Sequence, residues 1–328
     1  MIYDPYSRQI QEDPFPAYRY FLEEEPVTYN EKMDFYAVFR FEDVWNATLD
    51  WKTYSSRLGP SLENRGEMPG EVMSIIGMDP PRHVRIRTIV SKGFTPRRIA
   101  ALEAEVREIA ARYLDEFVEK GGGEIQHTFS NKLPMDVISA LLGLPEENRD
   151  EFREGVDMML SRDPETGLPP ADAIEAVGRN RKTMLDLLAA RRRDPKEDLI
   201  SVMAHAEYED VDGEQRKLDD NEVCAFINLL AAAGYETTMK LIGNCIVYLW
   251  QHPDQRAELW ADPSLMGGAI EEVLRYDAPS QFQGRVANAE TTLHGTTIPK
   301  DARVALVTGS AGRDPREFDE PDRFDIHR

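Results

Sequence analysis

The feature that most constrains the fold is a long apolar segment that lies between Asp219-Asp220 and His252-Pro253. Its apolar side chains occupy most helical positions, which predicts one helix from about Asn221 to Gln251. At a rise of 1.5 Å per residue, such a helix is roughly 45 Å long. Because a helix that is apolar most of the way round is normally buried on all sides, we expect this one to run through the core.

Polar groups interrupt this helix in one stretch, 233-AGYETT-238. A buried carboxylate such as that of Glu236 costs several kcal/mol unless it is paired or used. Gly234 lowers helix stability by about 1 kcal/mol relative to alanine, but it lets another group approach the backbone closely. The Thr237 hydroxyl can bond back to a carbonyl one turn earlier. The stretch is therefore either an open patch beside a proton-handling pair or a helix kink with a satisfied glutamate.

The composition is typical of a globular protein, since 41% of the 328 residues are hydrophobic and 30% are charged. Neither internal repeats nor a low-complexity linker divides the sequence, so we predict a single domain over residues 1–328. The net charge of -21 argues against nucleic acid as a partner, because phosphate binding requires clustered Lys and Arg.

No apolar run reaches the ~18 residues of a membrane span, and the N-terminal sequence MIYDPYSRQIQEDPF lacks the pattern of a signal peptide. We therefore predict a cytoplasmic protein without a membrane anchor. The two cysteines, Cys224 and Cys245, both lie in the apolar segment. Because of this position, we interpret both cysteines as small buried hydrophobic residues and do not expect a disulfide between them.

Helical periodicity dominates the rest of the sequence, and short β-branched or aromatic runs are fewer. Gly121-Gly122-Gly123 provides a helix end. The fold class is thus predicted to be mainly α with small β-sheets. We expect helices over 14–24, 41–50, 96–120, 171–193 and 263–276, a hairpin of 26–30 with 34–40, and small β elements between 285 and 311.

Two further features are ambiguous when each is taken alone. Glu272 and Arg275 are i, i+3 neighbours, and the apolar residues around them indicate partial burial. In a buried position, the planar guanidinium of Arg275 could hold the carboxylate of Glu272 through two parallel hydrogen bonds. The alternative is an exposed ion pair on the surface of a helix. Arg285 enters a β segment, where it either reaches a buried anion or is an ordinary strand residue.

The stretch 79-DPPRHVRIR-87 predicts the start of a helix, because Asp79 precedes proline. His83 and Arg87 share one face of this helix. Cations near a helix N-terminus oppose the macrodipole, so either a negative group lies nearby or the face is simply solvated. From Arg82 to Arg98 there are six Arg or Lys residues and no acid, which suggests a local anion or an acidic partner.

Five pieces of the sequence occur in a characteristic order: 83-HVRIR-87, 233-AGYETT-238, 272-EVLR-275, Arg285 and 313-RDPREFDEPDRF-324. With this order and spacing, the whole chain resembles a soluble bacterial-type cytochrome P450, a haem-thiolate monooxygenase. The resemblance implies the fold of that family, mainly α with small β-sheets. It also implies that this chain lacks the family's C-terminal cysteine loop and last helix.

The resemblance implies roles for the residues of the polar stretch and for the isolated cations. Thr237 would hydrogen-bond dioxygen, and Glu236 would supply protons to it from solvent. The cofactor would be haem b, with its propionates bound by His83, Arg87 and Arg285 and its distal face against Ala233 and Gly234.

A second implied group is structural. Glu272, Arg275 and Arg323 would form a buried ion network on the proximal side of the haem. The family's axial ligand is a cysteine in a glycine-rich loop beyond the segment that matches Arg323, so the resemblance implies no metal ligand in this chain and places that cysteine beyond Arg328. Cys224 and Cys245 lie on the distal helix and do not replace it.

Two hypotheses about function follow from the resemblance. The first is a haem-dependent monooxygenase that oxidises a hydrophobic small molecule with O2 and two electrons from a ferredoxin-type partner, which the basic segment Arg82 to Arg98 could help to dock. In this hypothesis residues 1–328 alone are inactive. The alternative is a haem-free relative that binds and activates another enzyme, such as a glycosyltransferase. The intact Glu236-Thr237 pair argues against that alternative.

The same pair argues against peroxide-driven fatty-acid chemistry in this fold, because that chemistry usually replaces the pair with Arg-Pro. Apolar faces of loops and helices are expected to form the walls of a substrate pocket. Their apolar character indicates an apolar ligand of medium size. These expected walls are residues 57–77, 158–174, 228–232 and 278–282.

Overall fold

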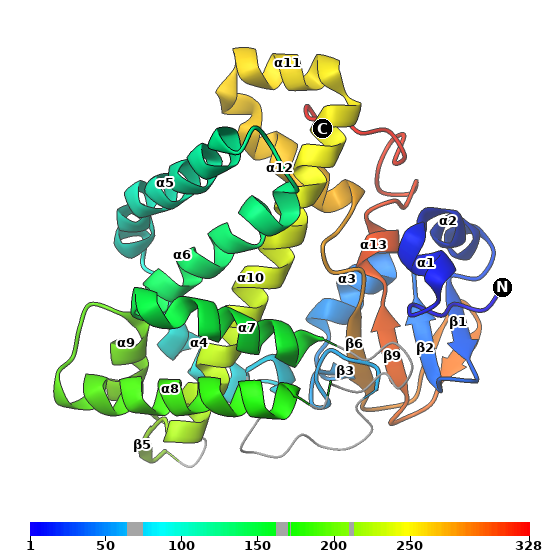
Figure 1. Ribbon diagram of the computed structural model, residues 1–328. Helices are drawn as coiled ribbons and strands as arrows, with labels where there is room; N and C mark the ends of the chain where they lie inside the picture. The colour runs from blue at the N-terminus through cyan, green and yellow to red at the C-terminus, as the bar shows by residue number, and fades with distance from the viewer. Residues whose placement is uncertain (64–74, 162–169, 171, 210–212) are drawn as a thin grey trace. The chain divides into compact units, whose positions relative to one another are not determined.

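The computed structural model describes residues 1–63, 75–161, 170, 172–209 and 213–328 (Figure 1). Its contacts group into two compact units, which are described separately. The sheet unit consists of Met1–Met68, Ile76–Asp79 and Leu241–Arg328, and the helical unit consists of Pro69–Ile75 and Pro80–Lys240. None of the described helices is both long enough and apolar enough to cross a membrane. The single domain over residues 1–328 stays a prediction.

The sheet unit is built on a five-stranded sheet with the order β1-β2-β9-β6-β3. Strands β2 and β9 pair in parallel, and the other neighbours pair antiparallel. A separate hairpin joins β7 to β8 through His294 and Gly295, whose positive φ angles of 49° and 83° suit a two-residue turn. The strands are β1 Val27–Asn30, β2 Phe35–Val38, β3 Tyr54–Ser55, β6 Gln283–Ala287, β7 Thr291–Leu293, β8 Thr296–Ile298 and β9 Arg303–Leu306.

The predicted N-terminal hairpin is confirmed, since β1 and β2 pair from Val27 opposite Val38 to Asn30 opposite Phe35. The predicted helices over 14–24, 41–50 and 263–276 match three helical segments of this unit, whereas the helices at 8–12, 253–261 and 308–311 were not predicted. Phe21 of the second helix stacks on Phe39 at a centroid distance of 4.4 Å, in an aromatic core that also holds Tyr3. The helices are α1 Arg8–Glu12, α2 Phe15–Glu23, α3 Phe41–Leu49, α11 Pro253–Ala261, α12 Met266–Tyr276 and α13 Thr308–Ala311, with short 3-10 turns at Ile75–Gly77 and Pro263–Leu265.

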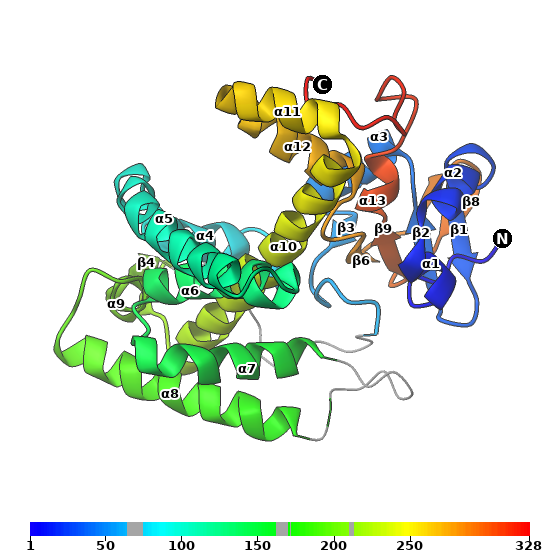
Figure 2. The same ribbon diagram turned by 45° about the horizontal axis from the view of Figure 1, so that its top comes forward.

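The helical unit has α7 and α8 packed side by side in both views (Figures 1 and 2). The predicted helix over 96–120 is confirmed as α5, which ends before Gly121 and Gly122, both at positive φ. The described elements are α4 Arg82–Ser91, α5 Pro96–Glu119, the π-helical turn η3 Gln126–Ser130, α6 Lys132–Leu142, η4 Glu146–Asn148, α7 Arg149–Leu160, α8 Ala173–Arg193, α9 Leu199–His205, and the hairpin of β4 Glu207–Glu209 with β5 Gln215–Lys217.

Helices α6, α7 and α9 were not predicted, because Pro134 and Gly155 interrupt the periodicity of α6 and α7, and α9 has only seven residues. Gly155 illustrates the reason in α7. A Cβ atom there would lie 2.2 Å from the side-chain amide of Asn180 in α8. Glycine therefore allows Asn180 to donate its hydrogen bond to the carbonyl of Phe152 at 2.9 Å. Packing between two helices, and not helix propensity, decides the residue at this position.

The predicted central helix is confirmed as α10, which runs without a break from Asp220 to Gln251. The prediction that it is buried on all sides is wrong for its second half. There, one stripe that includes Leu241, Cys245 and Tyr248 packs on the core next to α12. Val247 and Trp250 lie off that stripe and are 47% and 71% exposed. Apolar composition predicted the helix but could not show which faces have packing partners.

Candidate functional site

The polar stretch of α10 presents Ala233 and Thr237 one turn apart, and both residues are exposed. The Thr237 hydroxyl donates a hydrogen bond to the carbonyl oxygen of Ala233 at 2.7 Å, as predicted for a threonine within a helix. The helix stays continuous through this stretch. The structure therefore favours an open helix face over a broken helix at this position.

Glu236 forms an ion pair with Lys240, one turn further along α10, at 2.7 Å. The side chains of the two residues are 36% and 44% exposed, so the carboxylate is only partly buried. The expectation of a buried acid is therefore wrong, and the i, i+4 spacing of Glu236 and Lys240 is the sequence signal that indicates this ion pair. A partly exposed carboxylate next to a cation can exchange protons with solvent.

Gly234 contacts α6, where an added Cβ atom would lie 3.5 Å from the Ile138 side chain, an ordinary van der Waals distance. Packing among the described residues therefore does not require glycine at this position.

We expect Gly234→Ala to raise the free energy of unfolding by up to about 1 kcal/mol, the difference in helix propensity. Denaturant titration of both proteins measures this change. Gly143→Ala is a suitable control, because Gly143 has a φ of 83° and its Cβ atom would lie 2.3 Å from the Asp198 carboxylate. That variant should be destabilised, and a loss of stability in Gly234→Ala as well would contradict the packing argument.

Helix α4 begins at Arg82, and its N-cap is Pro81 without a side-chain hydrogen bond. The prediction that Asp79 starts this helix is wrong. Its carboxylate instead accepts hydrogen bonds from the Ser55 hydroxyl and, at 2.9 Å, from the Ser56 amide. Two prolines separate Asp79 from the first helical residue, which puts it too far along the chain to cap α4.

The cations of α4 have different surroundings. Arg82 forms an ion pair with Glu222, in the first turn of α10, at 3.2 Å. His83 is half-buried, and Arg87, one turn later, is exposed. The first turn of α4 contains no acidic residue. Within the described part of the chain, no carboxylate pairs with Arg87, so its guanidinium can bind an external anion.

Arg285 lies on β6 and is half-buried. Its guanidinium donates to the neighbouring carbonyl of Gly284 at 2.9 Å. Burial lowers the pKa of Arg285, and the negative charge of Asp79 partly offsets this effect. No carboxylate of the described residues forms an ion pair with it, and a partly desolvated guanidinium in this state favours a carboxylate ligand.

The predicted pair of Glu272 and Arg275 is buried and bidentate. The Arg275 guanidinium donates to the two Glu272 oxygens at 2.6 and 2.8 Å, and the side chains are only 8% and 1% exposed. Arg275 also donates to the carbonyl oxygens of Gly312, Pro321 and Arg323, at 2.7, 2.9 and 3.2 Å. This arginine thus connects α12 to the C-terminal segment.

The predicted third member, Arg323, joins the network through its carbonyl oxygen. Its guanidinium is 62% exposed and pairs with Glu320 and Asp325, at 3.2 and 3.7 Å. The second guanidinium next to Glu272 belongs to Arg328, at 3.3 Å. The sequence analysis missed Arg328, and no local signal connects it with a glutamate 56 positions earlier.

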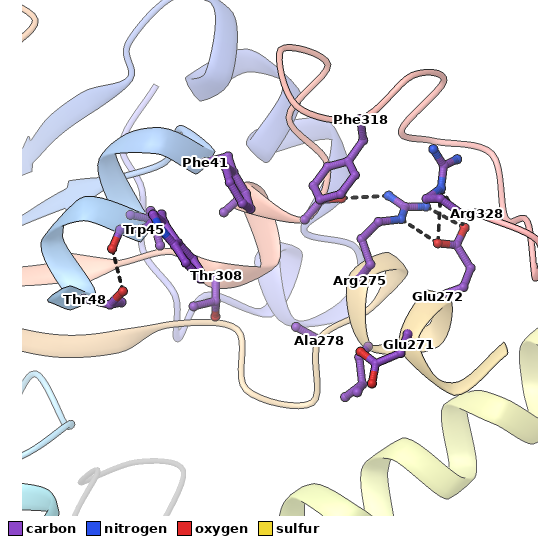
Figure 3. A pocket seen from close by; sticks show the side chains of 14 residues that line it. Phe41, Trp45, Thr48, Glu271, Glu272, Arg275, Ala278, Thr308, Phe318 and Arg328 are labelled. Carbon is purple, nitrogen blue, oxygen red and sulfur yellow. Dashed lines mark hydrogen bonds and ion pairs between the residues drawn. The ribbon is translucent and has the colours of Figure 1, made fainter. Parts of the chain in front are cut away.

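A pocket of about 620 Å³ lies next to this network in the sheet unit. Figure 3 shows the rings of Phe41 and Trp45 on one side and the pair of Arg275 with Glu272 on the other, with the Phe318 ring next to Arg275. The pocket thus combines an aromatic wall with a buried charge network. Its remaining lining residues are Val44, Thr48, Glu271, Leu274, Ala278, Thr308, Ala311, Gly312 and Arg328.

Both cysteines are free and occupy core positions. Cys224 is buried, and Cys245 packs against the apolar cluster next to α12. Burial raises the pKa of both thiols, so they are protonated at neutral pH. Among the described residues there is no group of three or more His, Cys, Asp or Glu side chains that could hold a metal ion.

The expected pocket walls 57–77 and 158–174 fall largely on residues 64–74, 162–169 and 171, outside the described residues.

Comparison with known proteins identifies the family. The family model "Cytochrome P450" matches residues 263–328. A Mycobacterium tuberculosis protein named cytochrome P450 123 is 40% identical over 330 residues, which span 100% of this chain and 81% of that protein. The chain belongs to the cytochrome P450 family. The Vitamin D(3) 25-hydroxylase of Pseudonocardia autotrophica is 35% identical over 99% of this P450 and 80% of its own length.

Solved structures agree on the fold. Cytochrome P450 CYP109Q5 from Chondromyces apiculatus matches with a TM-score of 0.84 and 36% identity, over 99% of this chain and 81% of that one. Substrate-free CYP109E1 from Bacillus megaterium matches with a TM-score of 0.87 and 29% identity, over 97% and 82%. The predicted fold class, mainly α with small β-sheets on the P450 plan, is confirmed.

Members of this family are haem-thiolate monooxygenases, so haem is the cofactor that membership implies. The cations of this P450 fit the propionates of haem, because neither Arg87 nor Arg285 has a carboxylate partner among the described residues.

Proposed function

We propose that this P450 oxidises a hydrophobic small molecule with O2 and two electrons from a ferredoxin-type partner. The observation that carries the proposal is the open face of α10, where the Thr237 hydroxyl lies next to the solvent-accessible pair of Glu236 and Lys240. The names of relatives support an apolar substrate, since one hydroxylates vitamin D(3) and a solved Bacillus megaterium relative holds testosterone.

His83, Arg87 and Arg285 would hold the two propionates of haem b, and Ala233 and Gly234 would lie against its distal face. The haem supplies the centre at which dioxygen is activated. Neither Arg87 nor Arg285 has a carboxylate partner among the described residues, which supports this assignment for these two cations. A cysteine beyond Arg328 would supply the axial thiolate.

Thr237 and Glu236 would handle protons. In the structure the proton of the Thr237 hydroxyl is directed to the carbonyl oxygen of Ala233, so the lone pairs of Oγ1 can accept a hydrogen bond. Rotation about χ1 would let the same hydroxyl donate toward dioxygen. Glu236 would take protons from solvent and pass them toward Thr237, since its carboxylate is partly exposed. This arrangement would provide general acid catalysis.

The electron donor would dock on the basic segment from Arg82 to Arg98. Lys92 and Arg97 are exposed in this segment, whereas the whole chain carries a net charge of -21. A local basic surface on an acidic protein attracts an acidic partner and orients it. The proposal places the protein in the cytoplasm, where its two free cysteines stay reduced.

Spectroscopy of the full-length protein tests this function. After haem loading, reduction and treatment with carbon monoxide, we expect the strongly red-shifted Soret band of thiolate ligation. The 328-residue chain alone should bind haem weakly and turn over no substrate, because its cysteines are protonated core residues. An unshifted band from full-length protein would contradict the proposal and would favour a haem-free protein that activates another enzyme, such as a glycosyltransferase.

A further inference from the structure

Lys240 has no role in the proposed proton path, although its ammonium group holds one end of that path. The Nζ atom of Lys240 lies 2.7 Å from the Oε1 atom of Glu236, and both residues belong to the helical unit. Within the described part of the chain, the ammonium is the hydrogen-bond donor to this carboxylate, and it bonds one oxygen. The Oε2 atom of Glu236 is thus left for water.

The two side chains of the proton path are bonded to opposite neighbouring turns of α10. The Thr237 hydroxyl donates to the carbonyl oxygen of Ala233, one turn toward the N-terminus, at 2.7 Å. The Glu236 carboxylate pairs with Lys240, one turn toward the C-terminus. No hydrogen bond joins Glu236 to Thr237 among the described residues. Direct transfer of a proton between them therefore requires the carboxylate to move from its position on Lys240.

The hold of Lys240 on Glu236 is weak enough to open often. The two side chains are 44% and 36% exposed, so water competes for both charges and salt screens them. Ion pairs of this kind at i, i+4 in a helix are formed only about two-thirds of the time. The carboxylate is therefore free for roughly a third of the time, and removal of the ammonium would raise its availability about threefold.

We propose that Lys240 is a positioning residue that holds Glu236 away from Thr237 and so limits how often this carboxylate delivers a proton. This inference rests on the proposed role of Glu236 in proton delivery. It makes oxygen activation sensitive to ionic strength, because salt weakens the pair. An ion pair that only stabilises the helix would have no such effect on the reaction.

Amine labelling of the full-length protein gives the first test, and its readout does not depend on turnover. An ammonium held by a carboxylate does not react with an acetylating N-hydroxysuccinimide ester, so the labelling rate reports how often Lys240 is free. Glu236→Gln should raise this rate about threefold, as measured by mass spectrometry of the peptides. Lys182, whose partner is Asp186 at 3.1 Å, is the internal control and should label at an unchanged rate. Equal rates at Lys240 in parent and Glu236→Gln would overturn the inference.

The ratio of product to peroxide in the holoenzyme gives the second test. This ratio compares proton delivery with peroxide release, so Lys240→Met should raise it about threefold. Lys240→Arg, which keeps a cation at this position, should bring it back to the value of the parent. Lys182→Met removes the same charge from a pair with the same spacing on α8 and should leave the ratio unchanged. Equal ratios in Lys240→Met and Lys182→Met would contradict the proposal.

Ionic strength gives the third test on the same holoenzyme. In the parent, a rise from ~0.1 M to ~1 M salt shortens the screening length from ~10 Å to ~3 Å and should raise the ratio of product to peroxide. Lys240→Met should lose this response, whereas Lys182→Met should keep it. If Lys240→Met responded to salt as the parent does, the response would have another source and the inference would be wrong.

The two proposals fail in distinguishable ways. Full coupling in the Glu236→Gln holoenzyme would end the proposed role of Glu236 and this inference with it. If Glu236→Gln loses coupling while Lys240→Met and Lys182→Met behave alike, Glu236 keeps its proposed role and the assignment of Lys240 is overturned.

Discussion

Replacing Arg275 with alanine is expected to lower the free energy of unfolding by about 3–5 kcal/mol, the usual cost of removing one partner of a buried ion pair. Glu272, whose side chain is 1% exposed, would lose a bidentate partner. Arg328 would remain at 3.3 Å, but it cannot reproduce the parallel hydrogen bonds. The carbonyl oxygens of Gly312 and Pro321 would also lose their donor.

Denaturant titration with matched arginine variants measures this effect. Arg323→Ala removes an exposed guanidinium and keeps the carbonyl that accepts from Arg275, so its effect should stay within about 0.5 kcal/mol. Arg275→Lys should recover only part of the loss, because an ammonium group cannot span both oxygens of Glu272. If Arg323→Ala were as damaging as Arg275→Ala, the predicted third member of the network would act through its side chain after all.

Replacing Thr237 with alanine should uncouple oxygen consumption from product formation in the holoenzyme. General acid catalysis by a positioned group typically contributes ~10²–10⁴-fold, so product formed per O2 consumed should fall by about 10-fold or more, with peroxide released instead. The substitution removes one hydroxyl from an exposed helix face, and its hydrogen bond to Ala233 lies within the helix. Stability should therefore change by less than about 1 kcal/mol.

Thr238→Ala is the matched control, because Thr238 is the exposed next residue on α10 but points about 100° further round the helix. It should leave the coupling unchanged, and Thr237→Ser, which keeps the hydroxyl, should retain much of it. Unchanged peroxide release and product yield in Thr237→Ala would show that the proton-delivery role is wrong.

The elements that the sequence predicted have local causes. Apolar residues at most helical positions predicted α10, and glycines that adopt positive φ end α5 at Gly121 and Gly122. The hairpin of β1 with β2 follows from alternating β-branched and aromatic residues. The i, i+3 spacing of Glu272 and Arg275 likewise suggested a pair that the structure shows to be buried.

The features that the sequence did not predict depend on contacts between distant residues. Asp79 bonds to Ser55 and Ser56 instead of starting α4, because the end of a strand lies next to it. Arg328 reaches Glu272 through a fold of the C-terminal segment that no local pattern encodes.

The parallel pairing of β2 with β9 has a consequence for biosynthesis. Phe35 of β2 pairs with Arg303, so the inner edge of the N-terminal hairpin acquires its neighbour only when most of the chain has been made. At typical translation rates of ~5–20 residues per second, this delay is roughly 15–50 s. During that time an unpaired strand edge is exposed, which is a known hazard for aggregation. The sheet unit should therefore complete its folding late in synthesis, and it is the part of the nascent chain most in need of a chaperone.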